Sequence, residues 1–270
     1  MQFKSIVRTA LVAALLAAPA AMVASAPAFA QAQPAATSKL DEIIAKGVLK
    51  VGMPGDYKPF GYYDKDKNTF EGFDADMAEA LGKAMGVKVE FVKTSWSNMM
   101  KDFEGGAFDM AVGGVSITLD RAKKGYFSTA MMREGKTPIT LCKNKDKFAT
   151  LEEIDKPETK VVVNPGGTNE RFARANLKAA NIRVYPDNNT IFNEIIKGDA
   201  DLMMTDSSET MYQQKLHPEL CAVHPDKPFD FAEKAYLLPR DLPMKQFVDQ
   251  WMHIMVETGQ YKTLFSKYFG

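Results

Sequence analysis

The chain has 270 residues, with 34 basic and 34 acidic side chains and a hydrophobic content of 46%. These proportions are typical of a globular protein and not of a disordered one. The formal net charge of zero lacks the basic excess of nucleic-acid-binding proteins, so we expect no nucleic-acid partner.

Residues 1–30 have the pattern of a secretory signal peptide. Lys4 and Arg8 precede a short apolar stretch, and small residues lead to an Ala-Phe-Ala sequence at 28–30. A membrane anchor is the alternative, but the apolar run is shorter than the ~20 residues that span a bilayer, and Pro19 interrupts it. We therefore expect a mature chain that begins near Gln31, lies in the periplasm and is not inserted in the membrane.

The mature chain contains two cysteines, Cys142 and Cys221. An even count in an oxidising compartment favours a disulfide, and the alternative is two buried thiols. A bridge closing so long a loop stabilises by about 4 kcal/mol at most in the chain-entropy model. No cysteine precedes Cys142, so no lipid-anchored cysteine follows the predicted cleavage site.

Strand and helix patterns alternate after a flexible leader at residues 31–37. The expected strands, in chain order, are 48–53, 87–91, 108–112, 137–142, 161–163, 182–185, 200–204 and an extended segment at 235–239. The expected helices are 73–85, where an apolar side chain recurs every fourth residue, then 169–179, 191–197, 207–216 and 243–256. Strands that alternate with helices predict an α/β fold with mostly parallel sheets.

The two series of strands and helices predict two lobes. Residues 38–138 and 236–270 are assigned to lobe 1, and residues 139–235 to lobe 2. The extended segments 137–142 and 235–239 then cross between the lobes as a two-segment hinge. The cleft between lobes joined in this way is the expected ligand site.

Several sequences resemble the periplasmic polar amino-acid-binding proteins, a family with the type II periplasmic binding protein fold. They are 40–43 (LDEI), 47–52 (GVLKVG), 59–60 (PF), 71–74 (EGFD) and 116–118 (SIT), followed by Arg121. The resemblance covers nearly the whole mature chain. It implies two lobes around a ligand cleft, with Arg121 bound to the carboxylate of the ligand.

A second set of sequences resembles the cyclohexadienyl dehydratases, an enzymatic branch of that fold. They are 55–60 (GDYKPF), 94–96 (TSW), 135–142 (GKTPITLC), 164–170 (NPGGTNE), 202–206 (LMMTD), 217–221 (HPELC), 229–234 (FDFAEK) and 239–241 (PRD). This resemblance implies a lyase that converts prephenate to phenylpyruvate, and L-arogenate to L-phenylalanine, with loss of water and CO₂. The alternative function is the amino-acid-binding subunit of an ABC importer.

Two segments carry groups suited to bind carboxylates. Arg121 offers a planar pair of donors that fits a carboxylate, and Ser116 and Thr118 lie on one side of the preceding extended segment. A surface arginine next to a helix is the alternative. Asn164 to Thr168 forms a Gly-Gly turn between a strand and a helix, where backbone N–H groups favour an anion. The turn lacks the phosphate-loop pattern, so a carboxylate is the expected guest.

Asp206 and Glu209 follow the strand at 200–204. Their spacing is that of a helix-capping pair, which is the structural alternative. The resemblance implies that the aspartate contacts the ligand in the cleft and that Glu209 is the general acid. Glu170 is the alternative acid, unless it only stabilises the first turn of its helix.

The remaining site candidates come from both predicted lobes. The resemblance implies a catalytic role for Lys136 and substrate contacts for Trp96, Asp56 and Tyr57. A lysine is more often solvated and a tryptophan more often in the core. The three histidines have no metal-ligand spacing, and no nicotinamide or serine-hydrolase motif is present, so we expect neither metal nor cofactor. The sequence does not indicate an oligomeric state.

Overall fold

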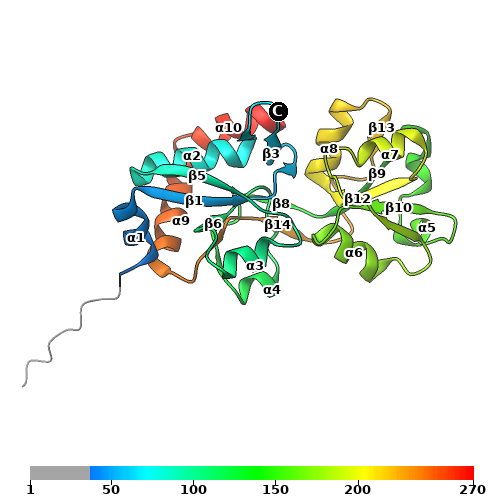
Figure 1. Cartoon of the computed structure of the whole chain (residues 1–270). Helices are drawn as coiled ribbons and strands as arrows, with labels where there is room; N and C mark the ends of the chain where they lie inside the picture. The colour runs from blue at the N-terminus through cyan, green and yellow to red at the C-terminus, as the bar shows by residue number, and fades with distance from the viewer. Residues whose placement is uncertain (1–36) are drawn as a thin grey trace, which may run out of the picture. The chain divides into compact units, whose positions relative to one another are not determined.

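The computed structural model describes residues 37–270, which form one compact unit. The predicted signal peptide and all but the last residue of the predicted leader lie outside the described residues. Two five-stranded sheets, each covered by helices, form the two lobes of an α/β fold, as predicted (Figure 1). Among the described residues, no helix is both long and apolar enough to cross a membrane.

The first sheet has the strand order β5–β1–β6–β15–β7. Its strands are β1 (Val48–Met53), β5 (Lys88–Lys93), β6 (Met110–Ala111), β7 (Tyr126–Phe127) and β15 (Leu237–Leu238). β1 pairs in parallel with β5 and β6, whereas β15 runs antiparallel between β6 and β7. A short three-stranded sheet is attached to this lobe: β2 (Asp56–Tyr57), β3 (Gly61–Asp64) and β4 (Thr69–Glu71).

The helices of the first lobe come from both ends of the described chain. They are α1 (Lys39–Lys46), α2 (Phe73–Met85), α3 (Met99–Glu104), α4 (Leu119–Ala122), α9 (Leu242–Glu257) and α10 (Gln260–Phe269). Figure 1 shows α9 and α10, in orange and red, beside the blue and cyan elements α1, α2 and β1. Phe73 of α2 lies edge-on to Phe265 and Phe269 of α10. The C-terminal helices therefore pack against the helices of the first lobe.

The second sheet has the strand order β11–β10–β12–β9–β13. Its strands are β9 (Lys136–Leu141), β10 (Lys160–Val163), β11 (Asn181–Val184), β12 (Leu202–Asp206) and β13 (Leu220–Ala222). β10 is parallel to β11 and β12, and β9 is antiparallel to both β12 and β13. The helical segments here are a 3₁₀ helix (Cys142–Lys147), α5 (Leu151–Ile154), α6 (Thr168–Asn176), α7 (Phe192–Lys197) and α8 (Ser207–Leu216).

The chain passes between the two sheets twice, and the two connecting segments pair as an antiparallel ribbon. It pairs β8 (Met132–Glu134) with β14 (Ala232–Lys234). The predicted boundary between residues 138 and 139 falls within β9, and the one between 235 and 236 falls just after β14. We propose this ribbon as the two-segment hinge between the lobes.

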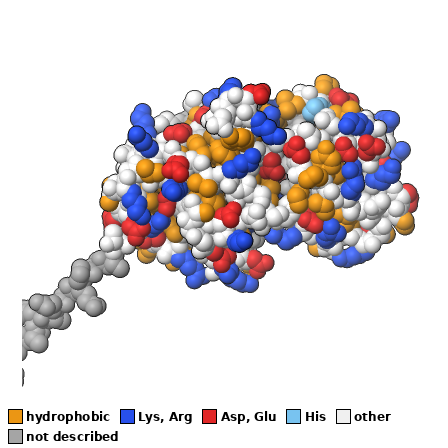
Figure 2. All heavy atoms as spheres, viewed as in Figure 1, with side chains coloured by type: hydrophobic (Ala, Val, Ile, Leu, Met, Phe, Trp, Pro, Cys, Tyr) orange, Lys and Arg blue, Asp and Glu red, His pale blue; other side chains and the backbone are white. Residues whose placement is uncertain are grey.

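The disulfide between Cys142 and Cys221 is present, as predicted. It joins Cys142, the residue directly after β9, to Cys221 in β13, and the two strands are neighbours in the second sheet. The alternative of two free thiols is wrong. On the molecular face shown in Figure 2, acidic and basic side chains are interspersed, in keeping with a chain of zero net charge.

Candidate functional site

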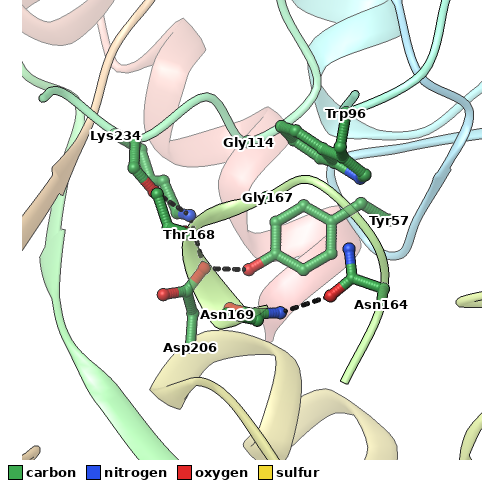
Figure 3. Close-up of a pocket in the computed structure, with 10 residues that line it drawn as sticks. Tyr57, Trp96, Gly114, Asn164, Gly167, Thr168, Asn169, Asp206 and Lys234 are labelled. Carbon is green, nitrogen blue, oxygen red and sulfur yellow. Dashed lines mark hydrogen bonds and ion pairs between the residues drawn. The ribbon is translucent and has the colours of Figure 1, made fainter. Parts of the chain in front are cut away.

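A small polar cavity lies where the two lobes meet, at the carboxyl ends of their parallel strands (Figure 3). It is lined by Tyr57, Trp96, Gly114, Ser116, Asn164, Gly167, Thr168, Asn169, Asp206 and Lys234. Six of these residues are among the site candidates named from the sequence. Ligands of open α/β sheets bind at this end of the strands, because the connecting loops there point into the crevice.

The lobes are closed on this cavity. Its volume is about 20 Å³, far below the roughly 300–1,000 Å³ of small-molecule pockets. Gly166, with a φ of +75°, lies so close to Ser97 that an added Cβ would be 2.2 Å from the Ser97 Oγ. The hydroxyl of Tyr57 in the first lobe donates to Asp206 Oδ2 in the second, at 2.6 Å. A small-molecule ligand of ordinary size therefore enters only when the lobes separate.

Asp206 is the centre of a buried cluster of charges. Lys136 Nζ donates to its Oδ1 at 2.5 Å, and Lys234 Nζ donates to its Oδ2 at 2.6 Å. Burial alone would raise the pKa of this carboxyl, but the two ammonium groups hold its pKa well below the usual range. Figure 3 shows the Tyr57 hydroxyl and the Lys234 ammonium both directed at the carboxylate. Asp206 is therefore ionised, with donors on both oxygens.

The hinge ribbon supplies part of this cluster. Glu134 of β8 lies 3.0 Å from the ammonium of Lys234 on β14, and the side chains of both are 1% exposed. Burial acts to lower the pKa of Lys234, but the carboxylates of Asp206 and Glu134 raise its pKa overall. Lys234 Nζ also donates to Ser116 Oγ in the first lobe. The lysine thus joins the hinge to both lobes.

Glu209 lies in the first turn of α8 and is 1% exposed. Its Oε2 accepts a hydrogen bond from Thr205 Oγ1 at 2.5 Å, and its Oε1 accepts one from Asn188 Nδ2 at 3.0 Å. Burial, together with the nearby Asp206 carboxylate, raises the pKa of Glu209 to about 8, and the two hydrogen bonds oppose this shift. The carboxyl is therefore mostly protonated at neutral pH.

The helix-capping alternative for Asp206 and Glu209 is wrong. Asp206 is the N-cap residue of α8, but its side chain makes no capping hydrogen bond. Its carboxylate instead binds two ammonium groups, and the Glu209 carboxyl binds Thr205 and Asn188. Glu209 is buried beside the cavity and does not line it in the closed arrangement.

The turn from Asn164 to Thr168 lies in the cleft and is held by Lys136. The ammonium of Lys136 donates to Thr168 Oγ1 at 2.8 Å and to Asn169 Oδ1 at 2.5 Å. Asn169 Nδ2 donates in turn to Asn164 Oδ1 and to Thr205 Oγ1, both at 2.9 Å. Lys136 is 2% exposed, and this burial lowers its pKa, although Asp206 opposes the shift. The lysine thus orders the turn from behind the cavity wall.

Arg121 is buried, with 4% exposure, so the alternative of a surface arginine is wrong. Its Nη1 donates to the backbone oxygen of Ser116, which lines the cavity, at 2.8 Å. Burial lowers the pKa of Arg121 to about 10. Among residues 37–270 no carboxylate forms an ion pair with it. Thr118 caps the following helix by accepting from the Arg121 backbone N–H, and it does not line the cavity.

Asp56 and Trp96 form a pair at the edge of the cavity, where Trp96 Nε1 donates to Asp56 Oδ1 at 2.8 Å. Burial raises the pKa of Asp56 to about 6. Glu170, the alternative acid, accepts from the Gly166 backbone N–H and pairs with Arg174, both at 2.9 Å. The Gly166 hydrogen bond lowers the pKa of Glu170, so this carboxyl is ionised at neutral pH.

Four polar residues of the site were not found by sequence reasoning: Glu134, Asn169, Asn188 and Lys234. They lie in two hinge strands, a helix start and a loop, and none is part of a recognisable catalytic spacing. The sequence 229–234 did carry the resemblance to the dehydratases, and this was the one available signal for Lys234. Within residues 37–270, no three His, Cys, Asp or Glu side chains are grouped to hold a metal ion.

Residues 49–270 match the model of the bacterial extracellular solute-binding proteins, family 3, and the chain belongs to this family. Within it, the chain is 55% identical over 239 residues to the cyclohexadienyl dehydratase of Pseudomonas aeruginosa, covering 88% of this chain and 87% of the relative. The resemblance to the cyclohexadienyl dehydratases, noted from the sequence, is confirmed.

Two solved structures of related proteins are similar to this chain. One is an ancestral amino-acid-binding protein described as a precursor of cyclohexadienyl dehydratase, with a TM-score of 0.79 and 38% identity, covering 86% of this chain and all of that one. The other is an ancestral cyclohexadienyl dehydratase, with a TM-score of 0.55 and 48% identity, covering 87% of this chain and 97% of that one. The predicted type II periplasmic binding protein fold is confirmed.

Proposed function

We propose that this chain is a cyclohexadienyl dehydratase, a carbon–oxygen lyase that converts prephenate to phenylpyruvate and L-arogenate to L-phenylalanine. The 55% identity to a dehydratase supports this function, and one observation of the site carries it. Glu209 is a buried carboxyl with a pKa of about 8, so it holds a proton at neutral pH. Such a group can act as a general acid near its pKa.

The reaction needs a proton at the ring hydroxyl. As the C–O bond breaks, the hydroxyl takes the proton of Glu209 and leaves as water. The bond from the ring to its carboxylate breaks at the same time or next, CO₂ leaves, and the electron pair of that bond completes the aromatic ring. Glu209 is left as a carboxylate and regains a proton from water when the lobes open.

The other groups of the site bind and orient the substrate in this proposal. Arg121, the turn ending at Thr168 and Lys136 provide the positive field for the carboxylate of the side chain that is kept. The carboxylate that departs must not be strongly paired, because an ion pair would oppose its loss. Tyr57, Trp96, Ser116 and Asn164 line the cavity and restrict the pose of the ring. Asp56 supports Trp96.

The importer subunit is the second candidate, supported by the likeness to the ancestral amino-acid-binding protein. An amino-acid carrier needs an ionised carboxylate open to the ammonium group of its ligand. Both oxygens of Asp206 already accept from lysine ammonium groups of this chain. A protonated, desolvated Glu209 has no task in a carrier, whereas a dehydratase needs it. The enzyme is therefore the better supported function.

We also propose that the protein works in the periplasm after signal cleavage. The family is extracellular, and residues 1–30 have the signal-peptide pattern. Intact mass of the periplasmic protein is expected to correspond to a start near Gln31, with two hydrogens fewer for the disulfide. A protein that keeps residues 1–30 would contradict the location.

A direct assay tests the enzyme. Purified protein is incubated with prephenate, and phenylpyruvate is followed by its absorbance; L-arogenate is tested by measuring L-phenylalanine. Calorimetric titration with L-amino acids runs in parallel. Turnover of prephenate supports the dehydratase. Tight binding of an amino acid with no turnover of either substrate would show that the importer function is the correct one.

A further inference from the structure

Asn188 lies in the turn between β11 and α7 and is 1% exposed. Its Nδ2 donates to two acceptors, each at 3.0 Å: the backbone oxygen of Asp56 in the first lobe, and Glu209 Oε1 in the second. An amide nitrogen carries two hydrogens, so both bonds can form at once. One side chain therefore contacts both the opposite lobe and the proposed acid.

The contact with Asp56 decides which end of the Asn188 amide faces Glu209. A backbone carbonyl oxygen only accepts, so the nitrogen must be at this position. The other end of the amide, Oδ1, is buried and has no hydrogen-bond partner within residues 37–270. Buried acceptors without a partner are rare in proteins and often lie at functional positions.

The proton of Glu209 is constrained by this arrangement. Asn188 donates to Oε1, and Thr205 donates to Oε2. The Thr205 oxygen itself accepts from Asn169 Nδ2, so its own hydrogen is available for Glu209. Because a carboxylic O–H cannot point at a donor, the acid proton is directed away from both neighbours.

The turn that holds Asn188 is fixed to the second lobe. The backbone N–H of Asn189 donates to the side-chain Oδ1 of Asp187 at 3.0 Å, and the backbone N–H of Thr190 donates to the backbone oxygen of Asp187 at 3.2 Å. The next residue, Ile191, is fully buried in the core of that lobe. Asn188 therefore stays with Glu209 when the lobes separate, and loses only its contact with Asp56.

Loss of that contact frees the amide of Asn188 to turn over. Its Oδ1 can then accept a hydrogen bond from the protonated carboxyl of Glu209, and this local bond holds the acid proton within the second lobe. When the lobes close, the backbone oxygen of Asp56 returns next to the amide, and Asn188 must again present its Nδ2 to this oxygen.

We propose that Asn188 is a positioning residue that makes the Glu209 proton available only when the lobes are closed. The inference rests on the proposed function, in which Glu209 is the acid, and assigns to one side chain the link between closure and proton transfer.

The titration of Glu209 reports on this link. The groups around its carboxyl are the carboxylates of Asp206 and Asp56, which raise its pKa, and the donors Thr205 and Asn188, which lower it. The phenol of Tyr57 is also close enough to interact. Removing the donor at position 188 should therefore move the titration of Glu209 to higher pH.

Two variants and a matched control test the proposal. Asn188→Asp keeps the size of the side chain but replaces the donor by an acceptor, and Asn188→Ala removes both. Asn189→Ala changes the exposed neighbour, whose side chain forms a hydrogen bond only with Asp187 in the described part of the chain. We expect kcat to fall by about 10- to 100-fold in both Asn188 variants, as for a misplaced catalytic group, and to be unchanged in the control.

The pH profile separates positioning from packing. The decline of kcat at alkaline pH should occur at higher pH in both Asn188 variants than in the wild-type protein. The infrared band of the protonated Glu209 carboxyl, assigned by its loss in Glu209→Gln, should titrate at higher pH in the same two proteins. Wild-type kcat in Asn188→Asp, or a lower kcat with an unshifted band in either variant, would overturn the proposal. If the wild-type protein turns over neither substrate, the proposed function fails, and the infrared titration alone still decides whether Asn188 controls Glu209.

Discussion

Replacing Glu209 by glutamine keeps the size of the side chain and removes the proton that the dehydratase reaction requires. Glutamine can still accept from Thr205 or Asn188, so the closed cleft should persist. With a pKa of about 8, about nine in ten molecules carry the Glu209 proton at pH 7. A positioned general acid contributes roughly 10²–10⁴-fold, so we expect kcat of Glu209→Gln to fall by that factor.

Substrate binding should be nearly unchanged in this variant, since glutamine keeps the size and most hydrogen bonds of Glu209, and the groups proposed to bind the carboxylate are not altered. The assay is steady-state turnover of prephenate from pH 5 to 10, with KM measured beside kcat. In the wild-type protein kcat should decline as pH rises through about 8, because the active form of Glu209 is the protonated one. The variant should lack this alkaline limb.

Stability gives a second measurement on the same two proteins. The folded-state pKa of Glu209 is raised above the ordinary value of 4.5, so the folded protein binds the extra proton between these values. The stability that this proton provides is fully present below about pH 4.5 and is lost progressively until the pH has risen through about 8. The free energy of unfolding should therefore fall more steeply with pH in the wild-type protein than in Glu209→Gln.

Glu170→Gln is the matched control, since Glu170 was the alternative acid. The Glu170 carboxyl is ionised and bound to Arg174, so glutamine there should leave kcat within a factor of about two or three, as for a surface pair. An active Glu209→Gln beside an inactive Glu170→Gln would show that Glu170 is the acid. Two active variants would refute a carboxylic acid in the mechanism.

Three further changes have defined outcomes. Arg121→Ala should raise KM by roughly one to two decades, which corresponds to the free energy of one charge-assisted hydrogen bond. An unchanged KM in the prephenate assay would place this residue outside the site. Lys234→Met should lower the free energy of unfolding in urea by about 3–5 kcal/mol, because it leaves the buried Glu134 without its cation and Asp206 with one ammonium group instead of two; adding Glu134→Gln should recover part of the loss, and full stability of the single variant would contradict the buried ion pair. Replacing Cys142 and Cys221 together by serine should cost up to about 4 kcal/mol in the same measurement, and an unchanged midpoint would show that the bridge adds no stability.

The order of strands and helices could be predicted from the sequence because each central element has a strong local pattern. Phe73, Met77 and Leu81 recur at helical spacing and are buried on one face of α2. The helix at 207–216 has the predicted bounds. α10 was missed, although Tyr261 and Leu264 repeat at helical spacing, because the pattern is separated from α9 by a break at Gly259, which has a φ of +75°.

The site could be predicted only where its residues belong to a local motif. Asp206 and the Asn164–Thr168 turn follow buried strands, so their position at the cleft was expected. Lys234, by contrast, follows the mixed stretch FDFAE, which has no regular period, and it meets Asp206 only in the folded chain, from β14 of the hinge ribbon. Asn188 lies in a loop 21 residues before Glu209, and no periodicity relates the two. Contacts made by tertiary closure leave no trace in local spacing.

The place of β15 in the first sheet sets an order of assembly. β15 lies between β6 and β7, and β7 pairs with this sheet only through β15. The strand comes from residues 237–238, more than a hundred positions after β7 in the chain. All strands of the second sheet, by contrast, lie in one continuous stretch between residues 136 and 222. Because a polypeptide is synthesised from its N-terminus, the second lobe can complete its sheet while the first is still open, and the last 34 residues close it.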